Sequence, residues 1–174
     1  AGHSAAVAIY ARDIAERLGM DAEQQQLAYL CGLVHDIGKI GLPAGLLEKP
    51  GALTLEERRE MQRHSEIGEG ILANVDTYAE IAAIVRHHHE RMDGQGIPDQ
   101  LHGKAIPLEA RIATIADALD AMTSARPYRR SELTLDGAMG ELRRHEGDQF
   151  DRDIVEAVLQ AAATGDLALV PRTA

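Results

Sequence analysis

Histidine and aspartate side chains stand at long intervals along this chain, in positions from which they could bind metal. His35 and Asp36 are adjacent at the end of an apolar segment, and the others follow far downstream. Imidazoles and carboxylates gathered on the inner faces of helices are ligands that transition metals prefer. We therefore predict a metal centre whose candidate ligands are His35, Asp36, His64, His88, His89 and Asp117.

The helix expected to carry His35 has a clear start signal. Asp21 and Gln24 have the spacing of a capping box, in which two side chains satisfy the first free N–H groups of a helix. Apolar residues then recur along one face as far as Val34, and glycines follow. His35 is therefore expected on the core side at a helix end, with Asp36 beside it.

The run from His87 to His89 can be placed by helical periodicity. Apolar side chains within residues 81–85 form one stripe, and at 3.6 residues per turn His88 and His89 fall on or beside it. His87 falls well off the stripe and is predicted to face solvent. Because two buried imidazoles both need polar partners, core packing alone hardly explains the inward pair.

Two other candidate ligands depend on weaker patterns. His64 is expected at the far end of a helix opened by a capping box of Thr54 and Glu57, and alone it would be an ordinary half-buried histidine. Asp117 lies in a long helix that is apolar on most sides, where an ionised carboxylate needs a partner or a metal. Asp120 could have the same role, but Asp117 is the preferred ligand.

His3 joins the candidate ligands if the first helix reaches it. That helix is predicted from Ser4 to Leu18, and His3 lies four residues before the buried Val7 on the same face. The alternative is a frayed terminal histidine.

The predicted substrate side contains basic residues and a glycine-rich loop. Arg126 and Arg129 suit bidentate contact with phosphate, with a solvated basic corner as the alternative. Lys39 could stabilise charge on phosphoryl oxygens, or be a surface lysine. The loop that carries Gly96 and Ile97 can approach a ligand closely because glycine imposes little steric limit.

These residue types indicate metal-assisted hydrolysis of a phosphoester. The single cysteine, Cys31, is interpreted as a core residue, which argues against a structural zinc site. Mixed imidazole and carboxylate ligands suit iron, manganese, zinc or nickel, and we take iron or manganese as the first candidates. Asp36 could bridge two metals, and a bridging water acidified to hydroxide would attack phosphorus in line. Asp36 and Lys39 are the predicted catalytic residues.

The chain as a whole predicts one all-α domain over residues 1–174. Hydrophobic residues make up 45% of the 174 and aromatic residues only 3%, so the core must be built from alanine, leucine, isoleucine and valine. Their periodicity favours a bundle of about six to eight helices around the metal centre.

Net charge and the search for targeting signals limit the expected ligands and the expected cellular compartment. A formal net charge of -10 argues against binding of large nucleic acids, although bound cations can invert the local potential for a small phosphorylated substrate. No apolar run is long enough to span a bilayer, and one cysteine suits a reducing cytoplasm. Because the chain begins without methionine, we expect an upstream domain in a longer protein.

Taken together, the motifs resemble the HD-GYP subfamily of the HD phosphohydrolase superfamily. The resemblance spans nearly the whole chain, and its combination of motifs is far more specific than a His-Asp pair alone. Its elements are His35-Asp36-Ile37-Gly38-Lys39, His64, His88-His89-Glu90, Asp93-Gly94-Gln95-Gly96-Ile97-Pro98, Ile106-Pro107, Asp117 and Arg126-Pro127-Tyr128-Arg129.

The resemblance implies a helical, metal-dependent phosphodiesterase that hydrolyses cyclic di-GMP to linear pGpG and, in some members, GMP. It implies two divalent metal ions, with a third where His3 also binds, and it assigns Lys39, Arg126 and Arg129 to the substrate. Expected partners are a receiver or sensory domain and GGDEF-type domains, with a homodimer as one arrangement.

Two departures from the family pattern keep alternatives open. Gly96-Ile97-Pro98 replaces Gly-Tyr-Pro, so an aromatic ring and a hydroxyl are missing from the loop. The glutamate that binds a third metal in some members would precede His3 by four residues, before Ala1. The alternative functions are a metal-holding sensor of cyclic di-GMP with little turnover and a hydrolase of another cyclic dinucleotide or phosphoester.

Overall fold

The computed structural model describes residues 2–124, 132–167 and 169–170, and in these residues the fold is all-helical, as predicted. They form nine α-helices, of which eight have at least eight residues, and three short 3-10 helices. The α-helices are α1 (His3–Arg17), α2 (Ala22–Val34), α3 (Ala44–Leu47), α4 (Leu55–Gln62), α5 (His64–Leu72), α6 (Ala79–His87), α7 (Leu108–Thr123), α8 (Leu135–Arg144) and α9 (Arg152–Thr164). The 3-10 helices are η1 (Ile37–Gly41), η2 (Asp76–Tyr78) and η3 (Gly103–Ala105).

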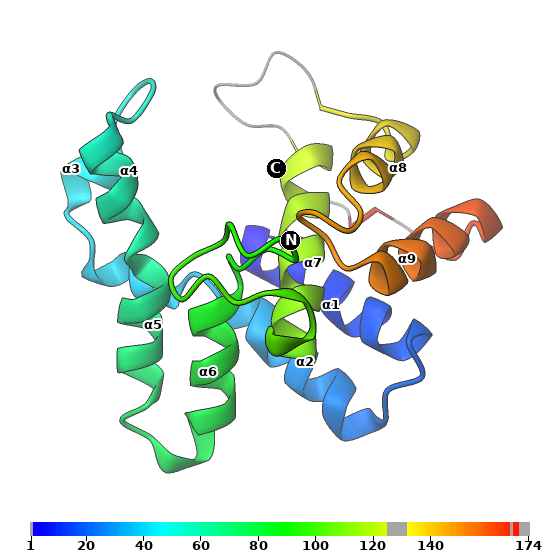
Figure 1. Cartoon of the computed structure of the whole chain (residues 1–174), viewed down its shortest axis with the longest axis horizontal. Helices are drawn as coiled ribbons and strands as arrows, with labels where there is room; N and C mark the ends of the chain where they lie inside the picture. Colours follow the sequence, from blue (N-terminus) through cyan, green and yellow to red (C-terminus); the bar gives the residue numbers. More distant parts are fainter. Residues whose placement is uncertain (1, 125–131, 168, 171–174) are drawn as a thin grey trace.

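Helix α7 runs through the middle of the molecule, between two hydrophobic clusters (Figure 1). On one side its apolar residues pack with α1, α8 and α9, and on the other its first turn packs with α2 and α6. Ile112, Ile115 and Leu119 of α7 are fully buried. A helix buried in this way can present a polar side chain to a site at the centre of the fold.

Helices α5 and α6 pack against each other, and α3 and α4 project beyond them (Figure 1). No residue of α4 is buried. None of the helices in the described ranges combines the length and the apolar character needed to cross a membrane.

The start signals in the sequence have mixed outcomes. Both predicted capping boxes are present: Asp21 accepts a hydrogen bond from the N–H of Gln24 at 2.9 Å, and Thr54 accepts one from Glu57 at 3.2 Å. Asp76 has the residue type of a helix cap, but its side chain makes no capping bond, and α6 begins only at Ala79.

Two glycines allow the elements around the site to approach each other closely. A Cβ atom on Gly32 would lie 2.8 Å from Cα of Ala8, so its absence lets α2 pack directly on α1. A Cβ atom on Gly38 would lie 1.8 Å from the carbonyl oxygen of His64. Glycine is thus required there for backbone to meet backbone, and this contact holds η1 against α5.

Candidate metal centre

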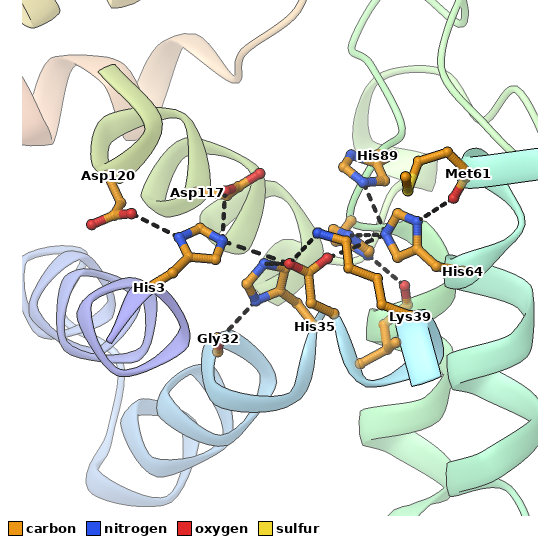
Figure 2. Close-up of polar contacts among 12 residues, drawn as sticks. His3, Gly32, His35, Lys39, Met61, His64, His89, Asp117 and Asp120 are labelled. Atoms are coloured by element: carbon orange, nitrogen blue, oxygen red, sulfur yellow. Dashed lines mark hydrogen bonds and ion pairs between the residues drawn. The ribbon is translucent and has the colours of Figure 1, made fainter. Parts of the chain in front are cut away.

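The predicted ligands come from segments far apart in the chain and meet in the middle of the fold (Figure 2). Most of them stand at helix ends, where the backbone turns toward the neighbouring element: His3 begins α1, His35 and His88 follow the last residues of α2 and α6, and His64 begins α5. Asp117 comes from the middle of α7. His64 was predicted at the far end of the preceding helix. That helix instead ends before Arg63, and His64 is the first residue of α5.

Two groups of candidate ligands can be distinguished by position. In each group the ligand atoms lie within 4.8 Å of one another. We call the first the imidazole group (His64, His88 and His89) and the second the carboxylate group (His3, His35 and Asp117).

Asp36 lies between the two groups and reaches both with different oxygens. Its Oδ1 is 3.4 Å from Nε2 of His64, in the imidazole group. Its Oδ2 is 3.4 Å from Nε2 of His35 and 3.6 Å from Nε2 of His3. A carboxylate in this position has the geometry to bridge two cations.

Three of the imidazoles are oriented by the backbone. The Nδ1 atoms of His35, His64 and His88 lie 2.8, 2.7 and 2.6 Å from the carbonyl oxygens of the residues three positions earlier in the chain. Since a carbonyl only accepts, each Nδ1 carries a proton, and in a neutral ring Nε2 then keeps its lone pair. Bonds of this kind fix the ring orientation of metal-binding histidines.

In their neutral forms, the Nε2 atoms of His64 and His88 then face each other without a proton between them. His64 Nε2 is 3.3 Å from that of His88 and 3.2 Å from that of His89. His35 Nε2 is buried and has no hydrogen-bond partner in the described part of the chain, although Asp36 Oδ2 lies 3.4 Å away. Unpaired buried lone pairs cost free energy. A divalent cation would satisfy them, so the donor set fits a metal.

Burial keeps the imidazole group neutral. It lowers the pKa of His64, although the Met61 carbonyl and the charge of Asp36 act in the opposite direction. Burial also holds the pKa of His88 well below its usual value and lowers that of His89 to about 4, helped in each case by nearby imidazoles. Neutral imidazole is the form that binds metal.

His3 has a different environment, which includes a residue whose role the sequence analysis missed. Its Nδ1 lies 2.7 Å from Oδ2 of Asp120, and its Nε2 lies 3.4 Å from Oδ1 of Asp117 (Figure 2). The hydrogen bond with Asp120 is the largest cause that raises the pKa of His3 to about 9, followed by contact with Asp36. Asp120, held by the hydroxyl of Ser124 at 3.2 Å, therefore orients a candidate ligand.

Asp36 remains ionised despite its partial burial. Burial alone would raise its pKa, but contacts with His3, His35 and Lys39 hold that pKa well below its usual range. The Lys39 Nζ lies 2.6 Å from Asp36 Oδ2, and 40% of the lysine side chain is exposed. Lys39 thus stands at the open edge of the centre.

The loop after His89 is fixed by a second residue with an unpredicted role, Glu90. Its side chain is fully buried and accepts hydrogen bonds from the N–H groups of Asp99 at 2.7 Å and Leu101 at 3.1 Å. The N–H of Ile97 donates to the carbonyl of His89 at 3.2 Å. These bonds hold the predicted substrate loop beside the imidazole group.

Gly96 allows this loop to pack closely because glycine has no Cβ atom. A Cβ atom there would lie 2.4 Å from Cα of Glu90 and from N of Arg91. Glycine is therefore required here for packing within the loop, and the close approach of this loop to a ligand stays a prediction.

Two other expectations can be compared with the structure. His87 was predicted to face solvent, which is wrong: only 14% of its side chain is exposed, and Nδ1 lies 3.6 Å from Asp99 and 3.8 Å from Glu90. The fold of the following loop covers it, which helical periodicity alone cannot reveal. Arg126 and Arg129, the predicted anion-binding pair, lie outside the described residues.

A helical fold with histidines and aspartates at this spacing is shared with a known family. The family model described as HD domain matches residues 1–154, and the chain belongs to this family. Within it the chain is of the HD-GYP type.

Curated relatives share the sequence over most of this chain. The chain is 42% identical over 152 residues to the cyclic di-GMP phosphodiesterase response regulator RpfG of Xanthomonas campestris, covering 86% of this chain and 40% of that protein. It is 44% identical over 144 residues to 3'3'-cGAMP-specific phosphodiesterase 1 of Vibrio cholerae, covering 83% and 33%. The chain thus spans well under half the length of these two relatives.

Solved structures agree in fold. Bd1817, described as an HDG"Y"P protein from Bdellovibrio bacteriovorus, superimposes with a TM-score of 0.74 at 20% identity, covering 92% of this chain and 51% of that one. At that level of identity the likeness concerns the fold alone.

Proposed function

We propose that this domain hydrolyses a phosphodiester bond of a cyclic dinucleotide, with cyclic di-GMP as the first substrate and linear pGpG, or GMP after a second cleavage, as product. The observation that carries the proposal is the convergence of histidine Nε2 atoms on the two oxygens of Asp36. The names of the relatives from Xanthomonas campestris and Vibrio cholerae support the substrate class.

Two divalent cations, iron or manganese, are the proposed cofactors. The imidazole group would hold one and the carboxylate group the other, with Asp36 contacting both. Cations in such a site lower the pKa of water and neutralise charge on a phosphoryl group. The donor set is free of thiolates, which suits these metals.

The chain's own side chains then hold and orient the substrate. Lys39 can leave Asp36, because much of its side chain is exposed, and donate to a phosphoryl oxygen. Arg126 and Arg129 are proposed to bind the substrate's phosphates as bidentate donors. We further propose a cytoplasmic setting, control by an upstream receiver or sensory domain, and contact with GGDEF-type domains.

Turnover can be tested directly with metal-loaded protein. Manganese- or ferrous-loaded protein, kept anaerobic, is incubated with cyclic di-GMP, and the nucleotides are separated by chromatography. We expect pGpG or GMP to appear, and chelation of the metal to abolish the product. Intact cyclic di-GMP under every metal condition, together with tight binding of the nucleotide, would favour a sensor instead.

The variant Asp36→Ala should abolish this activity and the retention of metal in both groups, because both depend on its carboxylate. The loss should exceed the roughly 10–100-fold that removal of an outer hydrogen-bonding partner costs. Asp13→Ala, which removes a half-buried carboxylate on α1 outside the metal centre, is the matched control. Turnover of Asp36→Ala at the parent rate would contradict the proposed mechanism.

A second candidate substrate is 3'3'-cGAMP. The Vibrio cholerae relative named for it is as similar in sequence as the one named for cyclic di-GMP, and Ile97 stands where the motif usually has tyrosine. The same assay with 3'3'-cGAMP distinguishes the two substrates by their kcat/KM values.

A further inference from the structure

A small pocket opens beside the imidazole group. It has a volume of about 290 Å³ and is bounded by His64 and His89 of the metal centre. One wall is Met61 and Gln62, at the end of α4, and another is Gln95 and Ile97, in the loop after His89. Whatever occupies this pocket lies directly next to the reacting centre.

The side chains that line the pocket do not favour a phosphate. Its one guanidinium, Arg91, is already engaged: Nε and Nη2 donate to the two carboxylate oxygens of Asp93 at 3.0 and 2.7 Å. The lining instead offers the apolar side chains of Met61 and Ile97 and the amides of Gln62 and Gln95. Apolar surface with a few polar groups is typical of sites for flat organic ligands.

Both glutamine amides are available for a ligand. Gln62 and Gln95 are exposed, and no hydrogen bond joins either side-chain amide to another described residue. A carboxamide has an acceptor oxygen and two donor hydrogens on adjacent atoms. It can therefore pair with the edge of a base that presents a donor beside an acceptor, as a purine does.

The size of the pocket and its fixed wall favour a single base. The pocket lies at the lower limit of the roughly 300–1,000 Å³ that small-molecule sites occupy, so it would hold only one part of a ligand as large as a cyclic dinucleotide. The wall with Gln95 and Ile97 is preformed, because Glu90 binds the N–H groups of Asp99 and Leu101 and His89 binds that of Ile97. A preformed wall lowers the conformational entropy that the protein loses when a ligand binds.

We propose that this pocket is a purine-base subsite, in which Gln62 and Gln95 determine whether guanine or adenine is preferred next to the scissile phosphodiester. Met61 and Ile97 would contact the faces of the base. The inference extends the proposed function, because it assumes a cyclic dinucleotide substrate.

The test compares kcat/KM for cyclic di-GMP, 3'3'-cGAMP and cyclic di-AMP in the parent protein and in Gln62→Ala and Gln95→Ala. We expect each variant to lose about tenfold on the preferred dinucleotide, mainly through KM, as loss of one or two hydrogen bonds would give. The ratio of kcat/KM values between guanine- and adenine-containing substrates should shift, while bound metal per chain stays constant. Gln160→Ala on α9 is the matched control, since its amide is exposed and far from the centre.

An unchanged ratio in both variants would overturn the inference, because a general disturbance of the fold lowers all three activities together. Binding of a phosphorothioate analogue of cyclic di-GMP, measured by calorimetry, separates this result from failure of the proposed function. A parent protein that binds the analogue but hydrolyses no dinucleotide would contradict the phosphodiesterase and leave the base subsite supported if both variants bind more weakly. Equal binding by parent and variants would overturn the subsite, and no binding by any of them would overturn both proposals.

Discussion

The imidazole group and the carboxylate group both contact Asp36 but differ in the exposure and charge of their other members. His64 and His88 are buried, and their rings are fixed by backbone carbonyls. In the other group His3 and Asp117 are 28% and 27% exposed, and His3 is held by the side chain of Asp120. The imidazole group is therefore neutral and largely oriented by the backbone, whereas the carboxylate group combines one buried, backbone-oriented histidine, His35, with the more exposed and charged His3 and Asp117.

This difference shows how one centre can hold two cations with different affinities. Buried lone pairs that face one another without a proton cost free energy, and a cation between them removes this cost. In the carboxylate group, protonated His3 already neutralises part of the charge of Asp36, Asp117 and Asp120. A metal there must compete with a proton. We infer that the imidazole group binds the more tightly held ion at neutral pH.

The largest expected difference is between His64→Ala and His3→Ala. The first should remove the ion of the imidazole group and reduce turnover by more than about 100-fold, since a ligand matters more than its outer partners. The second should lose only the ion of the carboxylate group. Elemental analysis of metal per chain, with turnover on the same samples, measures both. Equal losses of metal in the two variants would show that the groups act as one site.

Asp120→Asn should have a smaller and one-sided effect. An amide cannot supply the negative charge that orients and polarises the His3 ring, so the affinity of the carboxylate group for metal, corrected for the proton that His3 must lose, should fall by about 10–100-fold. The affinity of the imidazole group should remain that of the parent. Competition with a coloured chelator gives the affinities of both ions. Asp13→Asn, which makes the same change on α1 outside the metal centre, is the control. Equal weakening of both ions would refute the assignment of Asp120 to one group.

Proton release on metal binding should also differ between the groups. At pH 7 His3, with a pKa of about 9, is protonated and must lose its proton to bind metal through Nε2, whereas His89, with a pKa of about 4, has none to lose. Calorimetry in buffers of different ionisation enthalpy should detect about one proton released for the weaker ion and none for the tighter one. The affinity of the weaker site should rise between pH 7 and pH 9. Release of a proton with the tighter ion would contradict this account.

The same shifts have opposite consequences for the stability of the metal-free protein. The raised pKa of His3 contributes stability below its ordinary value of 6.5 that is lost as the pH rises through about 9. The lowered pKa of His89 contributes stability above 6.5 that is lost as the pH falls toward 4. Denaturant unfolding of the metal-free protein at several pH values can measure the loss of stability above pH 6.5 separately from the loss below it.

The sequence allowed the fold class and the positions of the main ligand candidates to be predicted, because both follow from local patterns. Asp21 and Gln24 cap a helix through neighbours three residues apart, and the apolar stripe of α6 leads directly to His88. The break at Arg63 was missed, because the capping box marks where a helix starts and does not predict where it ends. His64 was therefore predicted at the end of one helix, whereas it begins the next.

The supporting residues could not be assigned from the sequence, because their partners are distant or belong to the backbone of a loop. Asp120 meets His3 across 117 positions of the chain. Glu90 receives two N–H groups whose direction depends on the path of the loop around Ile97. The one available signal was the spacing of Asp117 and Asp120, which places both carboxylates on one face of α7.

The contact of Gly38 with the backbone of His64 has a consequence for the interpretation of related sequences. A single methyl group at this position would push η1 from α5 and draw Asp36 away from His64, with every ligand still present in the sequence. A relative can therefore carry all the histidines and aspartates and still lack the bridged centre. The residue at the position of Gly38 is thus as diagnostic of a working site as the ligands themselves, although it would bind nothing.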